Sequence, residues 1–383
     1  MRPKIKTTLR KKILGSLQKQ GYIVNSSRIE LPENPTKDDL RRLNELACRK
    51  KRNEANPRLV RYEDRLLERI ASGSEVVPEK IAPKLVLVKS GSENELLFRY
   101  ICLHWSIPVS SGYGRRLRFL VEDQNNRKLI GLLGLGDPVY SLRDRDQWIG
   151  WDADTKKERL YHVMDAFVLG AVPPYNSLLC GKLVAMLATS NTVRKAFRER
   201  YGGREALISG EVRKPYLALI TTTSALGRSS LYNRIRINGF DFWRRIGATK
   251  GWGEFHFSNG VYADIRAHAE KWCAPTAKKE SWGSGFRNRR EVTRKVLSHL
   301  DLSTNLGKHG IKREIYAAPL GRETLHFLRG ETELPRFFNK TERDLWSAFR
   351  QRWLLPRAER CPEFRNFDPE SYRIWKSNKR RAG

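Results

Sequence analysis

The sequence is poor in cysteine and has no long apolar run. Its five cysteines are odd in number, widely spaced and never arranged as C-x-x-C, so the 383-residue chain shows neither a disulfide framework nor a zinc ribbon. No stretch approaches the about 20 apolar residues of a membrane span, and residues 1–10 lack the apolar core of a secretory signal. These absences predict a cytoplasmic protein that does not enter a membrane.

Acidic residues are scarce relative to basic ones. The chain has 74 lysines and arginines against 42 aspartates and glutamates, which leaves a formal net charge of +32. Such an excess is typical of proteins that bind nucleic acid. A basic surface can also contact an anionic membrane or serve solubility, but the sequence has no lipidation motif. We therefore predict a nucleic-acid partner and favour DNA, although charge alone does not identify the polyanion. No metal centre and no bound cofactor are indicated.

Length and composition divide the chain into three segments, because 383 residues exceed what one core usually organises. Residues 1–84 are basic and have helical apolar spacing, with Thr36 as the expected N-cap of a helix. Residues 85–270 have a mixed α and β pattern, and residues 271–383 are basic again. We expect a helical N-terminal domain, a mixed core and a basic C-terminal extension.

The middle segment has the clearest local pattern. Arg116 to Val121 and Leu129 to Leu135 flank turn residues and predict a β-hairpin. The glycines of the second strand do not form a phosphate-binding motif, so we expect them to allow close strand packing. The elements expected after the hairpin are a strand, a helix, a strand and a helix, over Val163–Val172, Ser177–Thr189, Tyr216–Thr223 and Ser224–Asn238.

This order resembles the GCN5-related acetyltransferase fold, so the expected class is α+β. That family holds the cofactor pyrophosphate on backbone amides at a helix N-terminus, in an Arg/Gln-x-x-Gly-x-Gly/Ala loop. The matching loop here, Asn176 to Lys182, keeps only Gly181. The resemblance therefore implies an acetyltransferase-like core without the cofactor loop, and a degenerate acyltransferase remains an alternative.

A longer resemblance lies in blocks between Gly131 and Phe257: GLLGLGDPVYSLRDRDQWIGWD, FVLGAVPPYNSLLCGKLVAMLA, ITTTSALGRSSLYNRI and GFDFWRRIGATKGWGEFHF. Together with RWLLPRAER at Arg352 to Arg360, these blocks resemble the DruA family of the bacterial Druantia anti-phage defence system. The resemblance implies an antiviral role alongside other proteins of the same operon, including a large helicase-like component. It implies no mechanism.

Carboxylates gather after the expected hairpin. Such a cluster could hold the Mg²⁺ of a nuclease, which is the second enzymatic alternative. The simpler interpretation is a polar loop whose acids pair with Arg143 and Arg145. His162 and Asp165 also lie three residues apart near a strand. The clustered acids are Asp137, Asp144, Asp146, Asp152 and Asp154.

The best candidate for binding phosphate is the polar end of the strand that finishes at Thr223. Hydroxyl groups and arginines follow it closely, and Tyr232, Trp243 and Trp252 offer rings on which unpaired bases could stack, unless they belong to the core. A second basic stretch follows Gly285. The predicted nucleic-acid-binding residues are Arg228, Ser229, Ser230, Arg234, Arg236, Lys182, Arg289 and Arg290.

Overall fold

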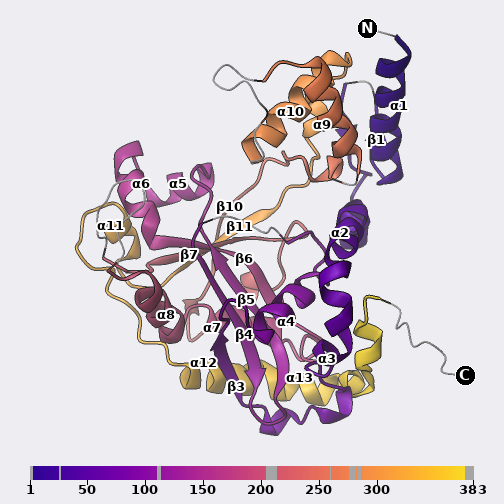
Figure 1. The fold of residues 1–383 in the computed structure, drawn as a ribbon. Helices are drawn as coiled ribbons and strands as arrows, with labels where there is room; N and C mark the ends of the chain where they lie inside the picture. Colours follow the sequence, from indigo (N-terminus) through magenta and orange to yellow (C-terminus); the bar gives the residue numbers. More distant parts are fainter. Residues whose placement is uncertain are drawn as a thin grey trace, which may run out of the picture.

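The computed structural model describes residues 3–25, 27–109, 114–203, 214–258, 260–275, 282 and 286–375. It is a mixed α+β structure built on a seven-stranded sheet, which confirms the expected class at that level (Figure 1). Adjacent strands of this sheet are antiparallel except for β6 and β7, which run parallel. In spatial order the strands are β10 (Arg244–Ala248), β11 (Glu314–Pro319), β7 (Leu219–Thr223), β6 (Val163–Ala171), β5 (Lys128–Gly136), β4 (Arg116–Asp123) and β3 (Pro83–Leu87).

Strand β5 is the most enclosed part of the sheet, since every residue after Lys128 is buried. Its glycines let the neighbouring strand approach. A Cβ at Gly131 would lie 2.4 Å from the carbonyl oxygen of Gly170, and one at Gly134 would lie 2.6 Å from the ring of Phe167. The hairpin expected from the sequence is β4 and β5, and the packing role expected for its glycines is confirmed.

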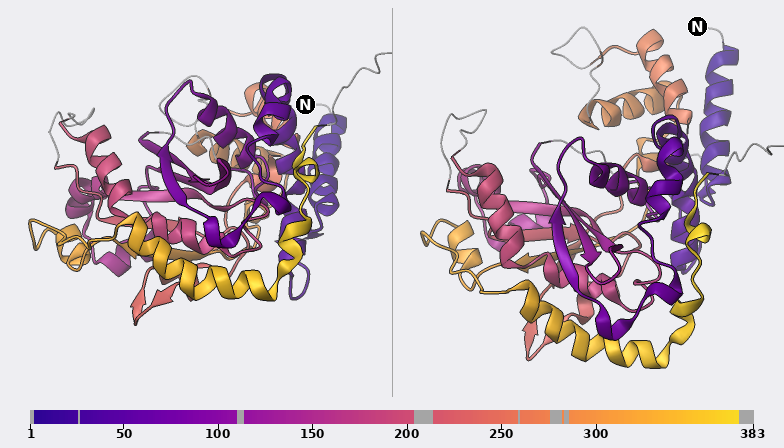
Figure 2. Two further views of the ribbon diagram at one scale, coloured as in Figure 1. Left: turned by 90° about the horizontal axis from the view of Figure 1, so that it is seen from below. Right: turned by 60° about the horizontal axis from the view of Figure 1, so that its bottom comes forward.

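One face of the sheet is covered by α7, α8 and a C-terminal helical stretch. Leu133 of β5 belongs to this core, together with Leu183 of α7 and Phe197 of α8. The stretch from Glu342 to Arg360 is the long yellow helical ribbon of Figure 2. A π-helical segment interrupts its regular pattern just before Pro356, which lacks a backbone N–H to continue that pattern. The helices are α7 (Cys180–Leu187), α8 (Asn191–Tyr201), α12 (Glu342–Phe349) and α13 (Leu355–Arg360).

Alternate residues of a strand point to opposite sides of the sheet, so the strands also have apolar side chains on the opposite face. Two smaller groups of helices cover that face. Leu132 of β5 packs with α3 and α4, whereas Val163 of β6 packs with Ile149 of α5 and Phe327 of α11. The helices on this face are α3 (Glu63–Leu67), α4 (Glu93–Cys102), α5 (Arg143–Ile149), α6 (Ala153–Arg159) and α11 (Thr324–Leu328).

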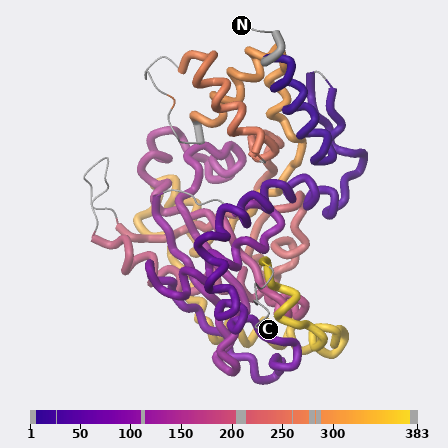
Figure 3. Tube along the Cα trace, turned by 45° about the vertical axis from the view of Figure 1, so that its right-hand side comes forward, coloured from indigo at the N-terminus to yellow at the C-terminus, as the bar shows by residue number. Residues whose placement is uncertain are grey.

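A separate apolar cluster joins the N-terminus to a segment about 250 residues later. Ile13 and Leu17 of α1 pack with Ile265 of α9 and Val296 of α10. This helical module lies beside the upper end of the sheet, where α1 runs along α9 (Figures 1 and 3). The division of the chain at residues 84 and 270 stays a prediction. The elements of the module are α1 (Pro3–Lys19), β1 (Ile23–Val24), β2 (Ile29–Glu30), the first part of α2 (Lys37–Leu59), α9 (Val261–Trp272) and α10 (Phe286–His299).

Local signals explain where some elements begin and why one expected helix is absent. Thr36 caps α2 through a reciprocal capping box with Asp39, as expected. The helix expected over 224–238 is wrong. Gly227 adopts a left-handed φ of +74°, and the Ser229 hydroxyl oxygen accepts hydrogen bonds from the next turn, so the chain forms turns and the ribbon of β8 (Arg236–Ile237) and β9 (Phe240–Asp241).

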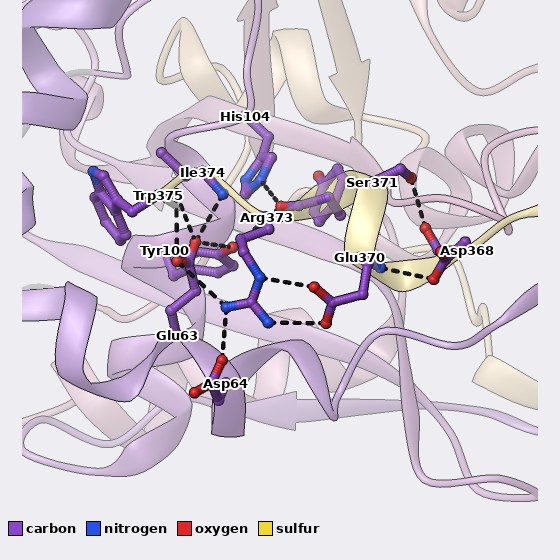
Figure 4. Close-up of polar contacts among 11 residues, drawn as sticks. Glu63, Asp64, Tyr100, His104, Asp368, Glu370, Ser371, Arg373, Ile374 and Trp375 are labelled. Atoms are coloured by element: carbon purple, nitrogen blue, oxygen red, sulfur yellow. Dashed lines mark hydrogen bonds and ion pairs between the residues drawn. The ribbon is translucent and has the colours of Figure 1, made fainter. Parts of the chain in front are cut away.

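The last described residues are held against α3 and α4 by a buried carboxylate (Figure 4). Glu63, only 2% exposed, accepts hydrogen bonds from the backbone amides of Ile374 (2.7 Å) and Trp375 (3.3 Å) and from the Tyr100 hydroxyl (2.8 Å). Arg373 adds an ion pair to Asp64 at 2.6 Å. Glu63 thus ties the C-terminal segment to helices that are about 300 residues away in sequence.

Among the described helices, none combines the length and apolarity needed to cross a bilayer.

We expect Glu63→Gln to lower the free energy of unfolding by about 1–3 kcal/mol, because the new amide group would face backbone N–H donors in place of a charged acceptor. Denaturant unfolding measures the change. Asp64→Asn is the matched control. Its carboxylate is 79% exposed in an ion pair, so the loss should stay within about 0.5 kcal/mol. Equal effects of the two variants would contradict this role of Glu63.

Candidate nucleic-acid interface

The topology places three basic turns at one end of the sheet. Strand β11 is antiparallel to both β7 and β10, so the end of β7, the start of β11 and the end of β10 lie together. Arg228 follows β7, Lys312 precedes β11 and Lys250 follows β10, and all three side chains are exposed. No ion pair or side-chain hydrogen bond engages these three cations within the part of the chain that the structure describes. They leave a concentration of positive charge beside the helical module.

The turn that carries Arg228 is held by an acidic residue that the sequence analysis did not single out. The Ser229 amide points to the Glu314 carboxylate at 3.4 Å, and that carboxylate also accepts the Tyr316 hydroxyl and pairs with Arg245 at 2.9 Å. Burial alone would raise the pKa of Glu314, but these partners outweigh it and lower the pKa below its usual value. No sequence motif marks Glu314, because a single glutamate near the start of a strand looks like any other surface acid.

The amides of this turn are consequently engaged. The Ser229 side-chain oxygen accepts the amides of Leu231 (3.2 Å) and Tyr232 (3.3 Å), as a capping hydroxyl does. Ser230 is exposed beside it. With these three amides occupied and Glu314 behind them, the exposed Arg228 guanidinium is the group that this turn offers to an anion.

The structure brings Lys182 and Arg234 together but exposes only the arginine. Lys182 is 8% exposed, donates to the carbonyl oxygen of Arg234 at 3.2 Å and lies 5.1 Å from the ring centre of Trp353. Burial, followed by the charges of Arg234 and Arg352, lowers its pKa. The Arg234 side chain is exposed. Lys182 therefore fills the start of α7 instead of presenting a charge to solvent.

Arg236, Arg289 and Arg290 are partly committed to neighbours. Arg236 pairs with Asp241 across the β8–β9 ribbon at 3.5 Å. Arg289 belongs to α10, where it donates to the Ser258 hydroxyl at 2.7 Å and lies 4.1 Å from the centre of the Tyr262 ring. Arg290 lies 3.8 Å from Glu254. These two arginines are thus part of the helical module, on a different element from the Arg228 turn.

Only one of the three aromatic side chains considered for base stacking is exposed. Tyr232 and Trp243 are 9% and 3% exposed and pack on each other with ring centres 5.1 Å apart. The Trp243 indole donates to the carbonyl oxygen of Ala185 at 3.0 Å. Both belong to the core, so a stacking role for them is wrong. Trp252 is 46% exposed and remains accessible.

The acidic loop is held by structural contacts. Asp146 pairs with the buried Arg145 at 2.6 Å, as one interpretation of the sequence expected, whereas Asp137 pairs with Arg115 at 2.7 Å and no described acid pairs with Arg143. Asp144 accepts the Ala248 amide at 2.7 Å and thereby covers the edge of β10. Asp152 caps α6. No group of three or more potential ligands in the described residues is placed to hold a metal ion.

Asp165 lies on the parallel pair at the centre of the sheet. Its carboxylate accepts the Thr221 hydroxyl of β7 at 2.8 Å. Burial raises the pKa of Asp165 to about 6, while the Thr221 hydrogen bond and the charge of Arg145 act in the opposite direction. His162 is bound to the carbonyl oxygen of Tyr216 at 2.8 Å and packs edge-on against Phe327. The two residues have separate partners.

The family model described as "Druantia protein DruA" matches residues 34–330. The chain belongs to the DruA family. It is 40% identical over 374 residues to the Druantia protein DruA of Escherichia coli (strain UMEA 4076-1), and the alignment covers 96% of this chain and 90% of that protein. No solved structure matches the chain. Both the Arg228 turn and α10 lie inside the part that matches the DruA family model.

We predict that Asp165 reduces stability as pH rises. Because the folded pKa of Asp165 exceeds the unfolded value, stability is lost between about pH 4 and pH 6, where the carboxyl is ionised in the unfolded state but still protonated in the folded state. The free energy of unfolding of Asp165→Asn relative to the parent should therefore increase by about 1–3 kcal/mol from pH 4 to pH 7.5. Denaturant unfolding at the two pH values measures this. The exposed variant Asp154→Asn serves as control, and a pH-independent difference for Asp165→Asn would rule out the effect.

Proposed function

We propose that this chain is a component of a Druantia anti-phage defence system and that its part there is to bind nucleic acid. Membership of the DruA family supports the first statement. The grouping of Arg228, Lys250 and Lys312 at one end of the sheet carries the second, because three exposed cations with no side-chain partner among the described residues form a surface suited to phosphate groups.

The net charge of +32 supports the same proposal. Many of the described carboxylates are engaged in ion pairs and helix caps. The contacts available at the Arg228 turn are guanidinium and ammonium groups without a fixed pattern of acceptors, which suits backbone phosphates better than base edges. We infer that binding shows little sequence preference. We further propose that operon partners, including a helicase-like protein, supply the specificity for a nucleic-acid target and any motor activity.

We also propose that the core has the GCN5-related layout without its cofactor site. The order of β3, α4, the β4–β5 hairpin, β6 and α7, with β7 parallel to β6, supports the layout. The start of α7 is filled by the chain itself. A Cβ at Gly181 would lie 2.9 Å from the side chain of Leu231, and Arg357 donates to the Ser177 carbonyl oxygen at 2.9 Å.

Acetyl-CoA should consequently show no saturable binding in the micromolar range that working cofactor sites commonly have. Isothermal titration calorimetry of the full chain tests this expectation. Should saturable binding occur and disappear in Gly181→Leu, the filled start of α7 would have to open in solution, and an acyltransferase role would replace the present proposal.

Binding of a single-stranded or duplex oligonucleotide should weaken steeply as salt rises, with a log–log slope that corresponds to about five or more released counterions. Arg228→Ala combined with Arg234→Ala should reduce that slope by about one to two. Fluorescence anisotropy of a labelled oligonucleotide across salt concentrations measures both effects.

The matched control removes two exposed arginines near the end of α2, Arg58→Ala with Arg61→Ala, and should change the slope by less than one. Weak, salt-independent binding by the parent would refute the nucleic-acid proposal. Equal losses in the two double variants would refute only the choice of surface. Phage protection in cells that carry the complete operon then relates binding to defence.

A further inference from the structure

A groove of about 490 Å³ opens beside α8, at the opposite end of β7 from the Arg228 turn. Its volume is within the about 300–1,000 Å³ of typical small-molecule sites. One wall is α8, and the other is made by the chain leading into β7 and by Phe337. Nothing in the family description or in the proposed function assigns a role to this groove.

The α8 wall is a stripe of cations. Arg198 follows Lys195 by three residues and Arg194 by four, and all three line the groove. Among the described residues that line the groove, which leave out 204–213, none is acidic, whereas Asp241 lines a second cavity and Asp39 and Glu45 line a third. The positive charge of this groove therefore has no counter-charge among its described lining residues.

The three cations are in different states of engagement. Arg194 lies 4.3 Å from the centre of the Phe337 ring and donates to Asn191 at 2.5 Å and to the Phe338 carbonyl oxygen at 3.0 Å, so it fixes the wall. Lys195 is 67% exposed in a loose 3.8 Å pair with Glu199. Arg198 is exposed, and its guanidinium has no partner among the described residues. Arg198 can thus bind an incoming anion without breaking a contact.

The opposite wall is aromatic. The rings of Tyr216 and Phe337 meet edge to face, with centres 6.0 Å apart and an angle of 72° between their planes. Asn191 holds the chain after Phe337 by two hydrogen bonds to the Lys340 backbone. The Asn191 backbone amide donates to the Lys340 carbonyl oxygen at 2.9 Å, and the Asn191 side-chain oxygen accepts the Lys340 amide at 3.0 Å. The aromatic wall is therefore fixed by the same helix that supplies the cations.

We propose that this groove binds a nucleotide, with the base against Tyr216 and Phe337 and the phosphate on Arg198 and Lys195. A planar ring with an attached anion matches an aromatic wall facing a cationic one. The nucleotide can be free or can be an unpaired residue of a strand, since both present the same base and phosphate. The inference does not depend on the Arg228 turn.

Binding of dAMP and deoxyadenosine to the full-length protein, measured by calorimetry at low salt, tests the site. We expect saturable binding of dAMP, at least about tenfold weaker binding of deoxyadenosine, and an about tenfold loss of dAMP affinity in Arg198→Glu. Arg200→Glu is the matched control, because Arg200 is exposed on the same helix but does not line the groove. It should change the affinity by less than about twofold.

A second arm uses a labelled oligo(dA) to identify the source of the nucleotide. If dAMP does not bind but Arg198→Glu weakens oligo(dA) at least about fivefold more than Arg200→Glu does, the occupant is a residue of a strand. If neither probe distinguishes the two variants, or if deoxyadenosine binds as well as dAMP, the proposal is wrong. The salt slope attributed to Arg228 and Arg234 is measured separately, so the two proposals can fail independently.

Discussion

The close contact between β5 and β6 is the constraint on which the rest of the structure depends. At Gly131 and Gly134 any side chain would collide with the backbone or a ring of β6, so glycine is required for the two strands to pair. Pairing in this register buries β5 on both faces and places Leu132 and Leu133 in different cores. Helices α3 and α4 on one face and α7 on the other then have surfaces against which to fold. The same register aligns β6 with β7, from which the Arg228 turn and the groove both extend.

The second constraint is charge, because a chain with a net charge of +32 must bring many cations close together as it folds. The structure reduces the repulsion by placing carboxylates where they join separate elements. Glu95 accepts Arg99 of its own helix at 2.9 Å and Arg118 of β4 at 2.7 Å. Although burial opposes the shift, the Gly91 amide and these arginines lower the pKa of Glu95 to about 2. Acids used in this way leave an excess of arginine and lysine at the surface.

This use of acids explains why the candidate residues differ in accessibility. Glu314 holds the Arg228 turn to the sheet and pairs with Arg245, so neither Glu314 nor Arg245 adds free charge there. Lys182 is enclosed by the C-terminal helices, although its place at a helix start suggested an anion site. Basic residues that are neighbours in sequence therefore have unequal access to a ligand, and only their tertiary partners determine which of them are available.

Patterns that depend on near neighbours were readable from the sequence. The α+β class, the β4–β5 hairpin, the packing glycines of β5 and the Thr36 cap follow from periodicity, turn residues and capping chemistry that act over a few residues. The blocks that resemble DruA proteins also lie in the sequence itself. Only the tertiary structure decided the rest. It placed Glu314 beside the turn at Ser229, some 85 residues away in sequence, and it joined Ile13 to Ile265 in one core. It also placed α8 opposite Tyr216 and Phe337. Such contacts depend on which distant apolar and charged groups meet during folding, and local sequence carries no signal for that choice.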